Sequence, residues 1–165
     1  MKRVQETKTD ALIVRISNRR TNVLPSAVVL ETYLKHAQEH DGKFLYGSPY
    51  HFNVQHLRNT GNFYLYSNVS GDAVAAKLWD ADEEYDPEEW KDEEYTIPRP
   101  FANRPYKTWI ACYDAHMEHL DAHQWRLQRP DKDGYKQNLA VSFRTGTLSP
   151  YLFVEPDGSG QPRSL

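Results

Sequence analysis

Residues 62–80, with the sequence NFYLYSNVSGDAVAAKLWD, carry two strand patterns separated by one turn signal. The first half is rich in aromatic residues and the second in small and branched apolar residues, and such apolar runs are consistent with strands. The VSGD segment between them contains Gly71, which suits a tight connection between antiparallel strands. We therefore predict a β-hairpin with strands at residues 62–68 and 73–80.

Two elements are expected before this hairpin. In DALIVRISNRR (10–20), alternate apolar residues predict a strand that ends in a polar turn. In NVLPSAVVLETYLKHAQEHDG (22–42), apolar residues recur every three or four positions, which predicts a helix that begins near Pro25 and ends at Gly42. Residues 43–61 are aromatic but interrupted by glycine and proline, so we expect a loop with a short strand or helical turn.

After the hairpin we expect one strand, one helix and two closing strands. They are predicted in YKTWIACYD (106–114), DAHMEHLDAHQW (114–125), LAVSF (139–143) and SPYLFVEP (149–156). Three prolines in residues 95–106 exclude a regular central strand there. The order of elements predicts an α+β fold, with a small curled mixed sheet or a β-barrel and flanking helices.

The composition indicates one folded domain. The chain has 165 residues, of which 26% are charged and 13% aromatic, whereas disordered chains are poor in aromatic residues. We expect an N-terminal arm (1–10), one domain (11–155) and a flexible tail (156–165). The sequence contains no apolar run long enough for a membrane helix, no apolar signal-peptide core and a single cysteine. These features predict a cytoplasmic protein that does not bind membranes.

The charge is distributed unevenly along the chain. WDADEEYDPEEWKDEEY (79–95) contains ten acidic residues and one lysine, so its net charge of −9 leaves +6 for the rest of a chain whose total is −3. We expect residues 80–95 to form an acidic excursion from a moderately basic body. Such a run is usually a solvated surface. Its interleaved aromatic residues also fit a surface that binds a basic protein partner.

The histidines of the predicted helix raise the possibility of a metal site. His116, His119 and His123 would share one helix face and could approach a single ion. Zinc requires three or four converging ligands, and neither an HExxH motif nor a remote cysteine or histidine pair is present. An exposed polar helix is the simpler interpretation. Cys112 lies in an apolar strand, which predicts a buried and inert thiol.

Polar and aromatic residues occur at several ends of the predicted strands. They are Ser17, Asn18, Arg19, Arg20, Asn68, Trp79, Lys107 and Trp109. If these ends converge, they form a pocket with aromatic walls that suits a flipped or single-stranded nucleobase. The tryptophans would stack on the base, the serine and asparagines would bind its edge, and the basic residues would bind phosphates. The alternative is that both tryptophans belong to the core.

The order of DALIVRISNRR, a helix, NFYLYSNVSGDAVAAKLWDADEEYDP and KTWIACYD resembles the PUA-like superfamily, particularly its EVE, ASCH and YTH-type branches. TGTLSPYLFVEP, with Thr147, Leu148 and Ser149, is similar to a closing segment of those domains. The resemblance spans about residues 11–155. It implies a small barrel that binds RNA or DNA, often at a modified base, in a pocket with aromatic walls.

The expected function is therefore a non-catalytic module that recognises a base, modified or not, in DNA or RNA. No cofactor is expected, because P-loop, GxGxxG and GxSxG motifs are absent. The module could also be part of a longer restriction-type protein. Two alternatives remain open. One is an acidic inhibitor that imitates nucleic acid and acts on a protein partner through residues 80–95, as in phage or bacterial defence. The other is a metal-dependent enzyme that uses the three histidines.

Overall fold

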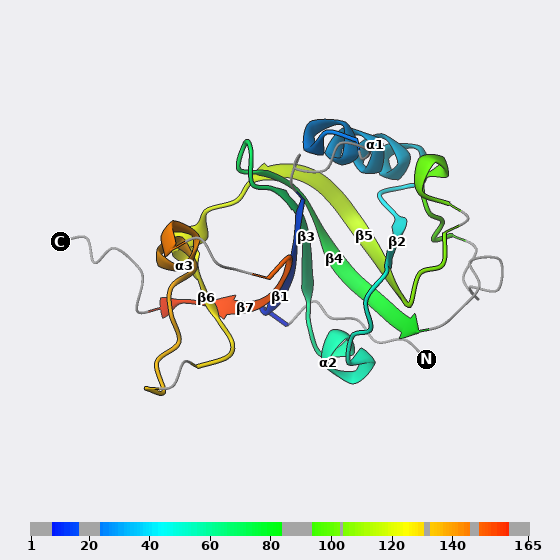
Figure 1. The fold of residues 1–165 in the computed structure, drawn as a ribbon. Coiled ribbons are helices and arrows are strands. Elements are labelled where there is room, and N and C mark those ends of the chain that lie inside the picture. Colours follow the sequence, from blue (N-terminus) through cyan, green and yellow to red (C-terminus); the bar gives the residue numbers. More distant parts are fainter. Residues whose placement is uncertain are drawn as a thin grey trace.

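A mixed sheet of seven strands forms the centre of the computed structural model, in the order β2-β5-β4-β3-β1-β7-β6 (Figure 1). The structure describes residues 8–16, 24–83, 94–102, 104–130, 133–145 and 149–158. The strands are β1 (Ala11–Ile16), β2 (Phe44–Ser48), β3 (Asn62–Ser67), β4 (Asp72–Glu83), β5 (Thr108–His119), β6 (Trp125–Leu127) and β7 (Tyr151–Pro156). The helices are α1 (Ser26–Glu39), α2 (Val54–Arg58) and α3 (Leu139–Thr145), with 3₁₀ turns η2 (Arg99–Phe101) and η3 (Ala122–Gln124).

The predicted hairpin is confirmed by β3 and β4, which pair antiparallel from Asn62 with Lys77 to Tyr66 with Ala73. The turn between them contains Gly71, whose φ of 84° lies in the left-handed region that glycine adopts without strain. β1 pairs parallel with β3, whereas the other ladders of the described sheet are antiparallel. The fold is therefore α+β with a mixed sheet, as the order of elements predicts.

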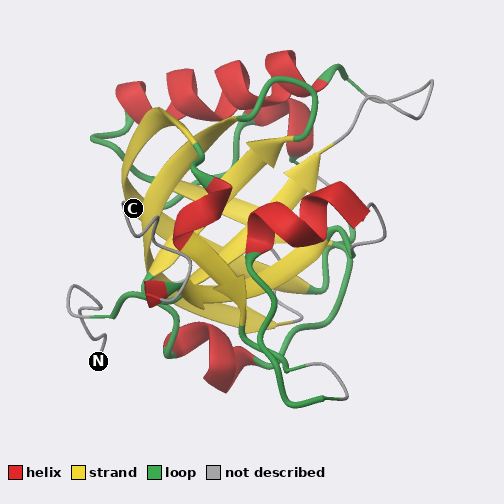
Figure 2. Cartoon of the chain, turned by 90° about the vertical axis from the view of Figure 1, so that its left-hand side faces the viewer, coloured by secondary structure: helices red, strands yellow, loops and turns green. Residues whose placement is uncertain are grey.

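The sheet curls, and its longest ladder is irregular. β4 and β5 contain 12 residues each, and their register shifts between Ala75 and Lys77 and again between Leu78 and Asp80. Such irregularities bend a strand and increase its twist. Figure 2 shows the strands curving around a common interior. Among the described residues β2 and β6 remain the edges of the sheet, so it is curled but not closed into a barrel.

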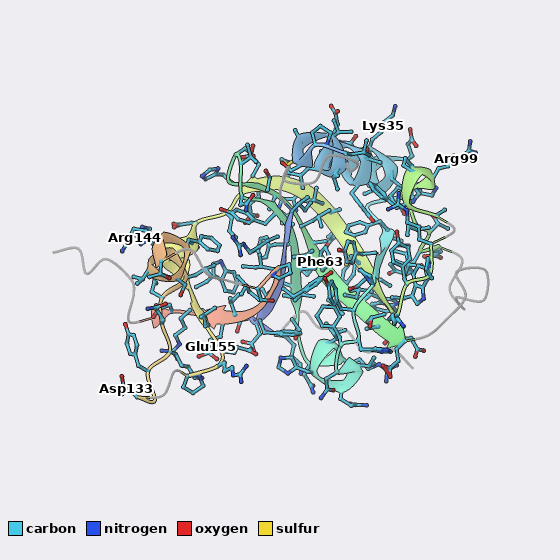
Figure 3. All side chains as sticks on the ribbon, viewed as in Figure 1. Lys35, Phe63, Arg99, Asp133, Arg144 and Glu155 are labelled. Carbon is cyan, nitrogen blue, oxygen red and sulfur yellow. The ribbon has the colours of Figure 1, made fainter. Side chains whose placement is uncertain are left out.

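The inner face of the curled sheet carries the main hydrophobic core. The predicted helix is confirmed as α1, which lies across the strands and contributes Leu30, Tyr33 and Ala37, spaced as the sequence pattern requires (Figure 1). Phe63 of β3 points into the middle of this core and is fully buried (Figure 3). Its ring meets that of Phe44 at a centroid distance of 5.9 Å. The inner face is therefore closed by side chains from both the sheet and α1.

Side chains also bridge the gap between β2 and β7, where the curl brings them near each other. The Ser48 hydroxyl donates a hydrogen bond to the Tyr151 hydroxyl at 3.2 Å. The Phe52 ring meets those of Tyr151 and Phe153 at centroid distances of 5.0 and 6.0 Å. We call this contact, formed by Ser48, Phe52, Tyr151 and Phe153, the seam. Within the described sheet no β-ladder joins β2 to β7.

Two smaller apolar clusters cover separate parts of the outer face. The first joins β1, β7 and α3 through Ile13, Val154 and Leu139. The second lies over β2 and β5, where Leu45 and Trp109 pack with residues of the segment 95–106. Tyr64 and Tyr66 of β3 pack against the first cluster, whereas Asn62 of β3 and Lys77 of β4 lie half-buried between the two clusters. This part of the sheet positions the candidate site.

The helix predicted at residues 114–125 is wrong. β5 continues to His119, and η3 and β6 follow it. A left-handed residue, Asp114 with φ of 56°, lies beside the register shift, and pairing with β4 resumes at His116. His116 and Glu118 lie opposite Ala75 and Ala73 of β4. The backbone pairs with β4 outweigh the helical spacing of the polar side chains.

The strand predicted at residues 139–143 is also wrong, because this segment forms α3. The Asn138 side chain accepts a hydrogen bond from the Ala140 N–H at 2.9 Å, as a residue preceding a helix does. A short apolar run fits a buried helical turn as well as a strand. The second closing strand is confirmed as β7, and the expected loop at residues 43–61 contains β2 and α2.

The acidic excursion begins later than predicted, because β4 continues to Glu83. Asp80 lies on this strand and accepts a hydrogen bond from the Arg58 guanidinium of α2 at 3.0 Å. Residues 84–93 lie outside the described residues, and Glu94 at their end pairs with Lys43. Most of the arm predicted at 1–10 and of the tail predicted at 156–165 also lies outside them. Among the described helices, none has the length and apolar character needed to cross a membrane.

Candidate functional site on the outer face of the sheet

The structure does not bring together those of the predicted strand-end residues that it describes. Ser17, Asn18, Arg19 and Arg20 lie outside the described residues, although β1 leads directly into them. Asn68 does lie beside the end of β1, since its N–H donates to the Ile16 carbonyl at 3.3 Å. This part of the predicted convergence is consistent with the backbone.

Trp79, Lys107 and Trp109 lie toward the other end of the sheet. Ala73 pairs with Tyr66, next to the β3–β4 turn, whereas Asp82 pairs with Trp109. Nine residues of β4 separate these two levels, which corresponds to roughly 30 Å along a strand. The predicted meeting of Asn68 with the two tryptophans is therefore wrong, because an antiparallel hairpin carries the end of its second strand away from the turn.

The two tryptophans belong to one packed aromatic cluster. Trp109 is 1% exposed, and its ring contacts that of Tyr106 edge to face at 5.1 Å. Trp79 is partly buried, stacked on Tyr95 at 6.3 Å and edge to face with Tyr113 at 5.8 Å. Trp109 thus has no free face on which a base could stack, and the core interpretation holds for it. Lys107 is exposed at the edge of this region.

The histidine arrangement predicted for a metal is wrong as well. His116 and His119 are three positions apart on a strand, so their side chains point to opposite faces of the sheet. His119 binds Asp72, and His123 belongs to η3. In the described ranges there is no group of three or more histidine, cysteine, aspartate or glutamate residues that could hold a metal ion. Cys112 is buried, as predicted, and burial raises the pKa of its thiol.

Two adjoining hollows lie on the outer face beside Asn62 and Lys77. Their volumes are about 450 and 590 Å³, within the range of roughly 300–1,000 Å³ that is common for small-ligand sites. Both are lined by Asn62 and Lys77, so they adjoin at these residues, and we call the two hollows together the outer groove. The first hollow also has Lys8, Gln124, Trp125 and Asp157, and the second has Tyr64, Asp114, His116 and Glu118.

The alternation of the central strands places these side chains together. Phe63 and Leu65 of β3 enter the inner core, so Asn62 and Tyr64 point to the outer face. Lys77 lies directly opposite Asn62 on β4. Small alanines at positions 73 and 75 leave space beside it. The groove therefore results from the register of β3, β4 and β5.

Lys77 is the most informative residue of the groove. It is half-buried and lies between Asn62 and Tyr113 in the sheet. Within the part of the chain that the structure describes, its ammonium group makes neither a hydrogen bond nor an ion pair. A cation that is partly removed from water without a partner lowers stability, and it is a ready binding point for an anion.

Aromatic and amide groups surround this lysine. The rings of Tyr64 and Trp125 meet edge to face at a centroid distance of 5.7 Å, and both are partly exposed at the groove. The Asn62 amide donates a hydrogen bond to the Asp10 carbonyl at 3.3 Å, which orients its side chain. Gln124 is exposed at the first hollow. The outer groove thus offers aromatic ring faces, amide groups and an ammonium group to a ligand.

No protein-family model, no curated protein and no solved structure matches this chain. The interpretation of the outer groove therefore depends on its own chemistry.

Two acidic residues, Asp114 and Glu118, line the second hollow. Glu118 accepts a hydrogen bond from His116 Nε2 at 2.9 Å, and His116 Nδ1 lies 3.2 Å from the Asp114 carbonyl oxygen. Both ring nitrogens therefore face acceptors, which favours the doubly protonated ring and raises the pKa of His116. Burial, followed by the charge of Glu118, raises the pKa of Tyr64 to about 12. Tyr64 is therefore a neutral phenol at physiological pH.

The sequence contains one signal for this site, and it lies in the middle of a strand, not at a strand end. In AVAAKLW (73–79), a single lysine interrupts an otherwise apolar strand. It shares the outer face with the alanines two and four positions before it. Tyr64 and Trp125 could not be connected to it from the sequence, because β6 reaches the groove only through its pairing with β7.

Proposed function

We propose that the outer groove binds two successive nucleotides of single-stranded RNA or DNA. Lys77 carries the proposal, because it lies at the junction of the two hollows and has no anionic partner among the described residues. A phosphate that joins two nucleotides would supply this partner. One base would then enter each hollow.

Tyr64 and Trp125 support this assignment, since each hollow contains one of them. Stacking of a base on an aromatic ring contributes about 1–3 kcal/mol per base and tolerates different sequences. The amides of Asn62 and Gln124 supply donors and acceptors for base edges. Lys8 also lines the first hollow, although its ammonium group donates a hydrogen bond to the Asn59 side chain at 3.3 Å. Aromatic faces, amides and ammonium groups together fit a nucleotide better than a purely apolar ligand.

The proposal keeps the non-catalytic nucleic-acid role that the resemblance to the PUA-like superfamily implies. It moves the ligand from the strand ends to the face of the sheet. The α+β class and the curled mixed sheet agree with the expectation from the order of elements, whereas the described strands do not close into the barrel that the resemblance implies. Membership of the superfamily, recognition of a modified base and a cytoplasmic location stay predictions.

The first prediction is that Lys77→Met weakens binding of a fluorescein-labelled oligouridylate or oligothymidylate, measured by fluorescence anisotropy. Loss of one phosphate contact reduces the slope of log K against log salt by about 0.7 on single strands. Methionine keeps most of the side-chain volume, so the fold is expected to survive.

Lys35→Met is the matched control, since Lys35 is an exposed lysine of α1 that points away from the sheet (Figure 3). It should bind like the unmodified protein at every salt concentration. If Lys77→Met and Lys35→Met give the same affinity and the same salt slope, the outer groove is not the binding site.

A further inference from the structure

Glu118 gives the second hollow a feature that phosphate binding leaves unexplained. Its side chain is 38% exposed and lines the same hollow as Lys77 and Tyr64. An anionic wall opposes a polyanion unless the ligand presents hydrogen-bond donors to it. We infer that Glu118 makes this hollow select guanine, an inference that depends on the proposed binding of single strands.

The chemistry of the bases favours guanine at a carboxylate. An ionised carboxylate only accepts hydrogen bonds, and its two oxygens can accept from a pair of adjacent donors. Guanine presents such a pair on its Watson–Crick edge, the ring N1–H and the exocyclic N2 amino group. Uracil and thymine place a carbonyl on each side of their single N–H, so their oxygens face the carboxylate. Adenine and cytosine pair one amino group with an acceptor ring nitrogen.

His116 fixes the carboxylate for this role. The bond from His116 Nε2 reaches Oε1 of Glu118, and the ring is held from its other side by the Asp114 carbonyl. The hydrogen bond to the ring limits the rotation of the carboxylate. The Tyr64 hydroxyl is hydrogen-bonded to the same carboxylate, which retains further acceptor capacity for a ligand because each of its oxygens has two lone pairs.

The spacing of Lys77 and Glu118 fits one nucleotide. Glu118 pairs with Ala73, and Lys77 lies four positions further along β4, which corresponds to about 13 Å. The side chains of Lys77 and Glu118 both line the second hollow. Because both extend into it, a ligand that contacts both can be shorter than the distance between the two backbone positions. A nucleotide with its phosphate at Lys77 would place its base over Tyr64 and its edge at Glu118.

The test compares three fluorescein-labelled pentanucleotides, UUGUU, UUUUU and UUIUU, in which I is inosine. Inosine lacks only the exocyclic amino group of guanine. We expect UUGUU to bind about tenfold more tightly than UUIUU, since inosine cannot make the second of the two parallel hydrogen bonds to the carboxylate. Glu118→Gln should reduce this ratio to about one, because an amide replaces one acceptor with a donor. Glu31→Gln on α1, also exposed, should keep the ratio.

The outcomes separate this inference from the proposed function. Lys77→Met should weaken all three oligonucleotides by a similar factor and keep the preference for guanine. If the unmodified protein binds UUGUU and UUIUU equally while Lys77→Met still weakens both, the groove binds single strands without guanine selection. A preference that persists in Glu118→Gln overturns the role of Glu118. If no oligonucleotide binds at low salt, both proposals are wrong.

Discussion

Two histidines on opposite sides of the sheet experience opposite electrostatic environments. The hydrogen bond to Glu118 is the main cause that raises the pKa of His116, and the Asp114 carbonyl adds to it. Burial is the main cause that lowers the pKa of His36, and the neighbouring His40 adds to it, although Glu39 acts in the other direction. The His36 and His40 rings are stacked at a centroid distance of 4.0 Å. Protonation therefore stabilises the fold at His116 and destabilises it at His36.

We expect His116→Gln to reduce the free energy of unfolding at acidic pH only. A raised folded-state pKa contributes stability that is complete below the ordinary value of 6.5 and is lost as pH rises through the raised pKa. The difference between the unmodified protein and His116→Gln should therefore shrink from pH 5 to pH 8. Urea unfolding at a series of pH values measures it.

His36→Gln supplies the opposite control. Because its folded-state pKa is lowered, His36 costs stability as pH falls below 6.5, so this variant should gain stability relative to the unmodified protein in acid. If His116→Gln changes the free energy of unfolding by the same amount at every pH, then the contact with Glu118 does not favour the protonated His116 ring in the folded state.

Among the elements, α3 depends on one asparagine that joins three segments. Asn138 accepts from the Ala140 N–H at 2.9 Å and donates to the Asp157 carboxylate at 2.7 Å and to the His123 carbonyl at 2.9 Å. Asp157 is 3% exposed, so this donor lies next to a buried carboxylate. The same side chain therefore begins α3, orders the segment after β7 and holds η3.

Asn138→Ala should lower the free energy of unfolding by about 2–3 kcal/mol, because a cap contributes about 1 kcal/mol and the loss of a donor to a buried acid adds to it. Asn53→Ala is the matched control, since Asn53 caps α2 with one hydrogen bond, to the His56 N–H at 3.1 Å. It should lose about 1 kcal/mol. Chemical denaturation of both variants tests the ranking, and equal losses would show that Asp157 does not depend on Asn138.

The elements also show which patterns are informative in this sequence. The hairpin of β3 and β4 and the helix α1 are predictable, because apolar strand-like runs on both sides of the hairpin turn and a three- to four-residue period over α1 are each supported by a turn or stop signal. The continuation of β5 to His119 is not predictable from the sequence. Its polar residues have helical spacing, and its strand geometry comes from pairing with β4. The α3 segment is too short for its period to distinguish helix from strand.

At the scale of the whole molecule, the inner core connects α1, the sheet and the only thiol of the chain. Phe63 and Cys112 both belong to this core and are fully buried. Removal of a buried phenylalanine costs about 3–5 kcal/mol. The thiol is therefore a reporter for the opening of the core, since burial also raises its pKa and suppresses the reactive thiolate.

We expect Cys112 to react with an aromatic disulfide reagent only when the molecule unfolds. Phe63→Ala should increase the labelling rate about hundredfold or more at neutral pH, in proportion to the population of unfolded molecules. Val69→Ala, in the exposed β3–β4 turn, should leave the rate unchanged. Fast labelling of the unmodified protein would show that the core opens locally around Cys112.

The candidate site could be predicted from the sequence only in its chemistry. Aromatic rings, amides and basic groups are expected near one another, and the outer groove contains all three. Their identity differs, because proximity is set by the strand order β6-β7-β1-β3-β4-β5 and not by position along the chain. Trp109 is buried in the second outer cluster, whereas Trp125, from a distant part of the sequence, lines the groove.

The seam has a mechanical consequence. Ser48, Phe52, Tyr151 and Phe153 hold the two sides of the curl through hydroxyl and ring contacts, to which Tyr46 and Tyr50 add at Tyr151, whereas neighbouring strands elsewhere are joined by backbone ladders. We therefore expect the molecule to resist deformation less across the seam than across its ladders, so that thermal fluctuations widen the curl there first.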